Sequence, residues 1–109
     1  MAISVMIRRK VIDKDKARNL APLIVKLRSL AASQPGYITG RTFRSLDDPG
    51  EFLVMSTWNS RDDWNRWLKS EQRTALQKQV DDLLGEETKY RLYESLAGGI
   101  IPEFKAVKD

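Results

Sequence analysis

Four segments of the chain carry the apolar pattern of β-strands. In residues 3–12, Ile3, Val5 and Ile7 recur at every second position. Residues 37–44 and 52–58 are also strand-like, and the loop sequence Asp47-Asp48-Pro49-Gly50 between them is typical of a hairpin. Residues 88–96 form the last such segment. The sequence therefore predicts four short strands.

Two other segments have helical spacing. The acids around Asp13 start the first helix, and it continues through leucines at positions 20, 23, 27 and 30 to end before Gln34-Pro35-Gly36. Pro22 falls inside this segment. Because an interior proline costs about 3 kcal/mol, either the helix kinks there or a short turn after Asp15 precedes the main helix.

The second helix is predicted to begin at Ser60, where Ser60-Arg61-Asp62-Asp63 resembles a capping box. It buries Trp64, Trp67 and Leu68, and its apolar spacing continues through Leu76, Val80, Leu83 and Leu84. Ser70 is a candidate interruption, and Gly85 is the expected stop.

This order, β-α-β-β-α-β, predicts an α+β, ferredoxin-like domain with a four-stranded antiparallel sheet and two helices on one face. The domain covers residues 1–97, and Gly98-Gly99 begins a C-terminal tail over residues 98–109. The length of 109 residues suits one domain.

The strands also predict a homodimer. Residues 52–55 and 5–7 are apolar on both faces, but the helices cover only one face of the sheet. A second copy packed across a two-fold axis is the simplest cover for the other face. The alternative is that the outward residues are apolar without a partner.

Composition excludes several kinds of chemistry. With neither Cys nor His, the chain has no thiolate nucleophile, no imidazole base and no His or Cys ligand for haem or zinc. Adjacent aspartates are interpreted as turns and solvated helix faces, so no metal site is expected. The net charge is +4, but basic and acidic residues are interleaved, and we expect no nucleic-acid partner. Without a membrane span or signal peptide in the sequence, the expected location is cytoplasmic.

Three short stretches resemble the antibiotic biosynthesis monooxygenase (ABM) family. They are Gln34-Pro35-Gly36-Tyr37, Asp47-Asp48-Pro49-Gly50 leading to Ser56-Thr57-Trp58, and Trp58-Asn59-Ser60 running into Trp67-Leu68-Lys69-Ser70. The resemblance implies a dimeric α+β barrel with a pocket between the helices and the sheet of each subunit. Enzymes of the family oxygenate aromatic molecules without metal or flavin, whereas other members cleave haem or act on quinols.

The haem-degrading branch carries an Asn on its first strand and a His ten residues after a matching Trp. In this chain those places hold Arg8 or Arg9 and Gln77. Haem cleavage is therefore not expected, and no cofactor is expected.

Candidate binding residues follow from the chemistry of oxygenation. Arg8 or Arg9, whichever faces the helices, and Arg41 are candidates to hold a substrate anion, with rim salt bridges as the alternative. Trp58, Trp64 and Trp67 are candidates for an aromatic wall, or else are plain core. Gln77 is either a hydrogen-bonding group or a partly exposed helix position. No strong general base is visible, because Tyr37, Tyr90 and Tyr93 have an ordinary pKa near 10.

The resulting hypothesis is a homodimeric, cofactor-independent monooxygenase that acts on a small aromatic or quinol-like metabolite. One alternative is a non-catalytic ligand-binding or stress-associated module on the same fold. Another is an interaction domain that uses the tail around Ile100 and Ile101.

Overall fold

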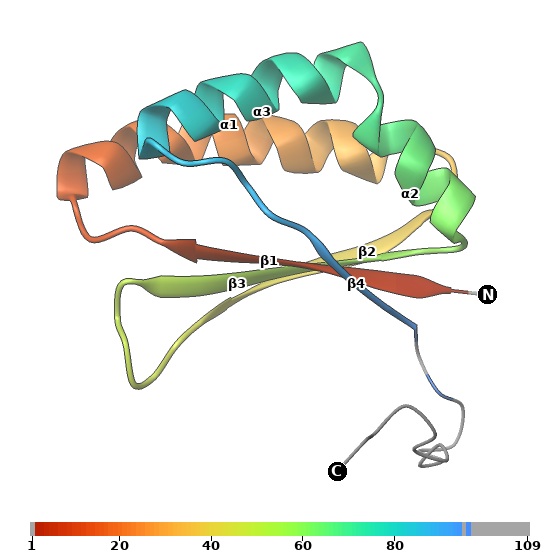
Figure 1. The fold of residues 1–109 in the computed structure, drawn as a ribbon, viewed down its shortest axis with the longest axis horizontal. Coiled ribbons are helices and arrows are strands. Elements are labelled where there is room, and N and C mark those ends of the chain that lie inside the picture. Colours follow the sequence, from red (N-terminus) through yellow and green to blue (C-terminus); the bar gives the residue numbers. More distant parts are fainter. Residues whose placement is uncertain (1, 95, 97–109) are drawn as a thin grey trace, which may run out of the picture.

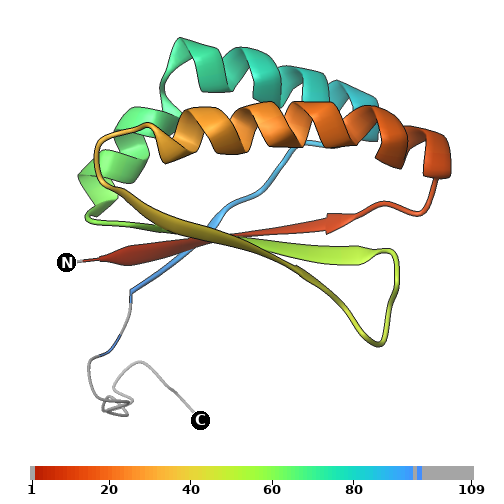
Figure 2. The same cartoon turned by 180° about the vertical axis from the view of Figure 1, so that it is seen from behind.

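Four antiparallel strands and three helices make up residues 2–94 and 96, the part of the chain that the computed structural model describes. In chain order they are β1 (Ile3–Lys10), α1 (Lys14–Ala32), β2 (Tyr37–Arg44), β3 (Glu51–Trp58), α2 (Arg61–Leu68), α3 (Glu71–Leu84) and β4 (Arg91–Glu94). The sheet order is β2-β3-β1-β4. Figures 1 and 2 show the helices on one side of the sheet. The predicted α+β, ferredoxin-like fold is confirmed.

The strand at the sheet edge is shorter than its sequence pattern suggests. A strand was expected over residues 88–96, but β4 covers only Arg91–Glu94, and it pairs with β1 from Ile3 to Met6. The remaining part of β1, residues 7–10, pairs with β3 alone. Residues 88–90 therefore approach the sheet without joining it, and this leaves space beside β1. The expected tail, residues 98–109, lies outside the described residues.

The first helix is continuous. The Asp13 carboxylate caps α1 by accepting hydrogen bonds from the backbone N–H groups of Asp15 and Lys16. Pro22 lies inside α1, so the alternative of a short turn before the main helix is wrong.

The predicted second helix is two helices. The helix α2 ends at Leu68, and the Ser70 hydroxyl caps α3 by accepting from the Arg73 N–H. The interruption at Ser70 therefore exists, and it changes the direction of the chain (Figure 1). The helix α3 ends, as expected, at Gly85, whose φ of 72° is left-handed.

The core lies between the sheet and the helices. Its buried cluster consists of Ile3, Val5, Trp58, Trp64 and Trp67. The side chains at Ile3 and Val5 point to the helices because they alternate along β1 with residues that face the other way. No helix within the described ranges is both long and apolar enough to span a bilayer.

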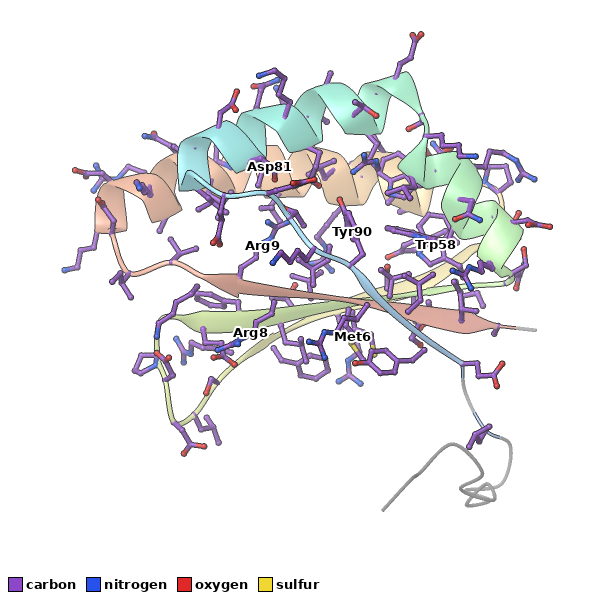
Figure 3. The ribbon with its side chains drawn as sticks, in the orientation of Figure 1. Met6, Arg8, Arg9, Trp58, Asp81 and Tyr90 are labelled. Carbon is purple, nitrogen blue, oxygen red and sulfur yellow. The ribbon has the colours of Figure 1, made fainter. Side chains whose placement is uncertain are left out.

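The opposite face of the sheet carries exposed apolar side chains. Phe43, Leu53 and Tyr93 are 40%, 36% and 48% exposed, and the strand register aligns Leu53 with both Arg8 and Phe43. Figure 3 shows Met6 and Arg8 on this same side, away from the helices. We call this surface, made of Met6, Phe43, Leu53 and Tyr93, the outer face.

Candidate functional site

A cavity of about 90 Å³, partly open to solvent, lies between the sheet and the helices. One wall consists of the three tryptophans, and the other consists of polar side chains from β1, α3 and the segment before β4. The polar wall consists of Arg9, Arg73, Gln77 and Tyr90, and other residues of α1, β2 and β3 complete the lining. Aromatic and cationic groups therefore face one space.

The aromatic wall is built around Trp58, at the end of β3. Its ring is stacked on Trp67 with centroids 6.4 Å apart and meets Trp64 edge-on at 5.7 Å. Trp64 and Trp67 share one face of α2 because they are three residues apart. The Trp58 indole N–H donates to the Ser56 hydroxyl at 3.0 Å. The wall is thus a rigid apolar surface suited to a planar ring.

The polar wall centres on the Tyr90 hydroxyl. It accepts a hydrogen bond from Arg73 Nη1 at 2.8 Å and donates to Gln77 Oε1 at 3.0 Å. Arg73 Nε donates to the backbone carbonyl of Leu68 at 2.7 Å, which anchors the guanidinium where α2 ends. Trp64 packs edge-on against the Tyr90 ring, with centroids 5.3 Å apart. Tyr90 therefore joins the aromatic and polar walls.

A second set of hydrogen bonds connects this wall to the first strand. Gln77 Nε2 donates to the Thr88 hydroxyl at 2.7 Å and to Asp81 Oδ1 at 2.9 Å. Thr88 Oγ1 donates in turn to Asp81 Oδ1 at 2.7 Å. Arg9 Nη1 donates to the same Thr88 hydroxyl at 3.2 Å. Figure 3 shows Arg9, Asp81 and Tyr90 on the helix side of the sheet.

Burial shifts the proton affinities at the site. Burial lowers the pKa of the Arg9 guanidinium, although Tyr90, Asp81 and Glu86 act in the opposite direction. Burial also raises the pKa of the Tyr90 phenol, against the influence of the Arg73 and Arg9 cations. At neutral pH Tyr90 is therefore protonated and serves as a hydrogen-bonding group rather than a base.

The positive charges at the site are not balanced by neighbouring carboxylates. Neither Arg9 nor Arg73 forms an ion pair with a carboxylate in residues 2–94 and 96. The same part of the chain has no group of three or more acids placed to hold a metal ion. The arrangement favours an anion or an electron-rich oxygen atom over a cation.

Six of the seven predicted site residues line this cavity: Arg9, Arg41, Trp58, Trp64, Trp67 and Gln77. The choice between the two adjacent arginines is decided by the strand alternation. Arg9 points to the helices, whereas Arg8 lies on the outer side and forms an ion pair with Glu51 at 2.7 Å.

Arg41 is not brought into the polar wall. Although it borders the cavity, it pairs in register with Met55, and its guanidinium carbon lies 5.4 Å from the Phe43 ring centroid. This placement belongs to the outer face. The cation therefore contacts an exposed aromatic ring there.

Arg73 and Thr88 were missed by sequence reasoning, and Tyr90 was not distinguished from the other tyrosines. A signal for Arg73 exists, because Arg73, Gln77 and Val80 lie at i, i+4 and i+7 and are the buried residues of α3. Thr88 carries no such signal, since it lies outside the strands and its contacts are long-range.

Comparisons with known proteins agree with this architecture. The family model for antibiotic biosynthesis monooxygenase matches residues 2–79. No curated protein sequence matches the chain.

Several solved structures share the fold. A conserved protein from Methanosarcina mazei Go1 superposes with a TM-score of 0.78 at 18% identity, over 88% of this chain and 94% of its own. Rv0793 from Mycobacterium tuberculosis gives 0.76 at 18% identity, over 92% and 100%. SnoaB, a cofactor-independent oxygenase from Streptomyces nogalater, gives 0.75 at 17% identity, over 94% and 98%.

Proposed function

The chain belongs to the antibiotic biosynthesis monooxygenase family, and we propose that it is a homodimeric, cofactor-independent monooxygenase of a small aromatic or quinol-like metabolite. The observation that carries the proposal is the cavity itself, where buried Arg73 and half-buried Tyr90 face a wall of three tryptophans. SnoaB, a cofactor-independent oxygenase of the same fold, offers a precedent for the chemistry.

The reaction class balances without an external reductant. A ring CH₂ flanked by aromatic carbons, together with O₂, gives a ring carbonyl and water. The substrate carbon supplies all four electrons, one oxygen atom enters the product, and the other leaves as water with both hydrogens. Such a substrate must first lose a proton and spread the negative charge onto an oxygen atom of the ring system.

The residues of the cavity suit that demand. Directed donors in a water-poor site stabilise a developing oxyanion more strongly than water does. The Arg73 guanidinium, held by the Leu68 carbonyl and the Tyr90 hydroxyl, is the preorganised donor. Trp67 presents an apolar surface against which the ring packs. The substrate is expected to lose its proton because it is itself acidic, since the protonated phenol of Tyr90 cannot act as a base.

Oxygen uptake tests the proposal. Metal-stripped protein is offered anthrones, naphthols and hydroquinones, and uptake is compared between Arg73→Gln and the control Arg66→Gln. Arg66 lies on the neighbouring helix, is mostly exposed and pairs with Asp63. Loss of one oxyanion donor lowers kcat by about 10²–10³, so Arg73→Gln is expected to lose nearly all uptake and Arg66→Gln to keep it. Equal uptake in the two folded variants would remove Arg73 from the reaction.

The dimer is proposed from the outer face. Exposed Phe43, Leu53 and Tyr93 form an apolar surface that a second copy covers across a two-fold axis. Light scattering is expected to give twice the 12.5 kDa of one chain. Leu53→Asp should produce monomers, whereas Leu46→Asp, at a leucine that is 95% exposed elsewhere, should not. A monomeric native protein would refute this part of the proposal.

A second candidate function is a binding module without turnover. The observation that favours it is the lack of a base among the residues that line the cavity, together with the small cavity volume. It predicts that the same aromatic molecules perturb the tryptophans but consume no oxygen.

A further inference from the structure

Arg9 has the least satisfied charge of the buried residues described. Its side chain is only 7% exposed, yet its single hydrogen bond within residues 2–94 and 96 is the one from Nη1 to the Thr88 hydroxyl. Its Nε is a buried donor without an acceptor in that part of the chain. Buried donors are normally paired, so an orphaned N–H on a cation is a feature that needs an explanation.

The nearest acids do not supply the missing partner. Asp81 and Glu86 influence Arg9 electrostatically, but neither lies within ion-pair distance. Asp81 is already engaged, since its Oδ1 accepts from Gln77 Nε2 and from the Thr88 hydroxyl. The Asp81 carboxylate is linked to Arg9 through the Thr88 hydroxyl and forms no ion pair with it. The hydrogen-bonding capacity of the Arg9 Nε is therefore unused within residues 2–94 and 96.

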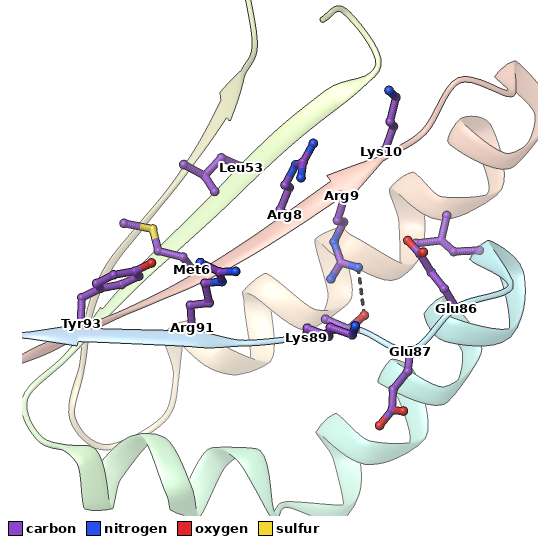
Figure 4. A pocket seen from close by; sticks show the side chains of 12 residues that line it. Met6, Arg8, Arg9, Lys10, Leu53, Glu86, Glu87, Lys89, Arg91 and Tyr93 are labelled. Atoms are coloured by element: carbon purple, nitrogen blue, oxygen red, sulfur yellow. Dashed lines mark hydrogen bonds between the residues drawn. The ribbon is translucent and has the colours of Figure 1, made fainter. Parts of the chain in front are cut away.

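Arg9 also stands at the junction of two spaces. It borders the tryptophan-lined cavity, and it borders a groove of about 740 Å³ along the part of β1 that lacks β4. The two sets of lining residues have Arg9 in common and no other residue. Figure 4 shows the Arg9 side chain reaching from β1 toward the segment before β4. A molecule that passes between the groove and the cavity must pass the guanidinium.

The other cations of the groove are less available or more exposed. Arg8 and Lys10 are paired with Glu51 and Asp48, at 2.7 and 2.9 Å. Lys89 and Arg91 also line the groove, and both side chains are exposed. Arg9 is thus the buried, incompletely paired cation of the passage.

We propose that Arg9 binds a carboxylate on the ligand, so that the molecule taken up by the cavity is an aromatic acid. Its ring enters the tryptophan-lined cavity, and its carboxylate stays at the junction with the groove, on the Arg9 guanidinium that lines both spaces. The planar guanidinium matches a carboxylate in geometry and charge. This inference rests on the proposed function, because it names the substrate class of the same site.

Size supports this division of the ligand. Pockets for small molecules commonly measure roughly 300–1,000 Å³. The cavity of about 90 Å³ accommodates only a compact group, whereas the adjoining groove of about 740 Å³ accommodates substituents. A ligand of ordinary size that enters the cavity from the groove therefore extends past Arg9, which places its polar part beside the guanidinium.

Benzoate and benzamide, equal in shape and different in charge, test the proposal. All three tryptophans of the chain belong to the cavity wall, so their indole N–H resonances report occupancy directly. At neutral pH we expect benzoate to bind at least about tenfold more tightly than benzamide, the ratio that corresponds to about 1.4 kcal/mol. This comparison needs no variant. Equal affinities, or no shift of the indole resonances with either probe, would overturn the proposal.

Arginines inside and outside the site supply a matched pair of variants. Arg9→Gln should abolish the preference for benzoate, and Arg9→Lys should retain part of it. Arg18→Gln, which changes the same residue type at an exposed position of α1 that lines neither the cavity nor the groove, should leave the preference intact. If Arg9→Gln folds and keeps the full preference, Arg9 serves only to hold Thr88 and the proposal is wrong.

The same probes separate this inference from the proposed oxygenase activity. A charge preference that depends on Arg9, without oxygen uptake by any aromatic acid, would support the carboxylate site and leave the binding module as the function. Oxygenation of neutral phenols with the same kcat/KM as their carboxylated counterparts would support the oxygenase and overturn the carboxylate site.

Discussion

Tyr90→Phe is the sharpest perturbation of the polar wall because it removes one oxygen atom and keeps the ring. That oxygen accepts from Arg73 Nη1 at 2.8 Å and donates to Gln77 Oε1 at 3.0 Å. Both partners are buried, at 9% and 7% exposure. A buried polar group left without its partner costs about 1–3 kcal/mol. Arg73 keeps its bond to a backbone carbonyl, so we expect the two losses together to lower the free energy of unfolding by about 2–4 kcal/mol.

Urea denaturation at one fixed protein concentration measures this effect, since stability depends on concentration if the protein is dimeric. Tyr37→Phe is the matched control, because the Tyr37 ring is also half-buried and packs against a core tryptophan, but its hydroxyl forms no hydrogen bond within residues 2–94 and 96. Its effect should stay within about 0.5 kcal/mol. A Tyr90→Phe variant as stable as the control would refute the description of these hydrogen bonds as buried and mutually dependent.

Three further predictions concern backbone strain, capping and ionisation. Gly36 and Gly85 both have positive φ, so Gly85→Ala is expected to destabilise the protein by roughly 1–2 kcal/mol. Gly36→Ala should destabilise it by more than that, because a Cβ at position 36 also clashes with Asp63. Thermal melting of the two variants measures the difference. Ser70→Ala should lower the free energy of unfolding in urea by about 1 kcal/mol through loss of the cap of α3; no change would contradict that capping role. The ultraviolet titration of tyrosinate should show a phenol that ionises above its ordinary pKa of about 10, and Tyr90→Phe should remove it. Because the folded state holds this proton more tightly than the unfolded state, the stabilisation is full below a pH of about 10 and is lost as the pH rises through the folded pKa.

The fold could be predicted because its signals are local. Alternation along β1 and the caps at Asp13 and Ser60 act over a few residues, and each appears in the structure as expected. The extent of β4 could not be predicted from the apolar pattern, because its pairing with β1 begins only at Arg91, opposite Met6. Thr88 and Tyr90 have strand propensity, but their hydroxyls form long-range hydrogen bonds to α3 instead.

The aromatic residues of the site could be predicted from the sequence, whereas most of its polar residues could not. The spacing of Trp64 and Trp67 indicates a buried helix face. From the sequence, an arginine such as Arg73 is expected to be exposed to solvent, because charged side chains are rarely buried. The helical spacing from Gln77 and Val80 marks its buried face, but its hydrogen bond to Tyr90, 17 positions away along the chain, has no local signal.

The polar face of α3 is hard to explain by stability alone. Arg73 and Gln77 occupy the same buried helix face as Val80, where apolar side chains of similar volume would pack against the tryptophans at no desolvation cost. Sequences usually depart from such local consistency at functional sites. Arg9 repeats the departure on the opposite layer, on a strand whose other inward residues, Ile3, Val5 and Ile7, are apolar. Two independent elements therefore give up apolar packing to direct guanidinium groups at one cavity, which is the arrangement expected if the cavity receives an electron-rich or anionic ligand.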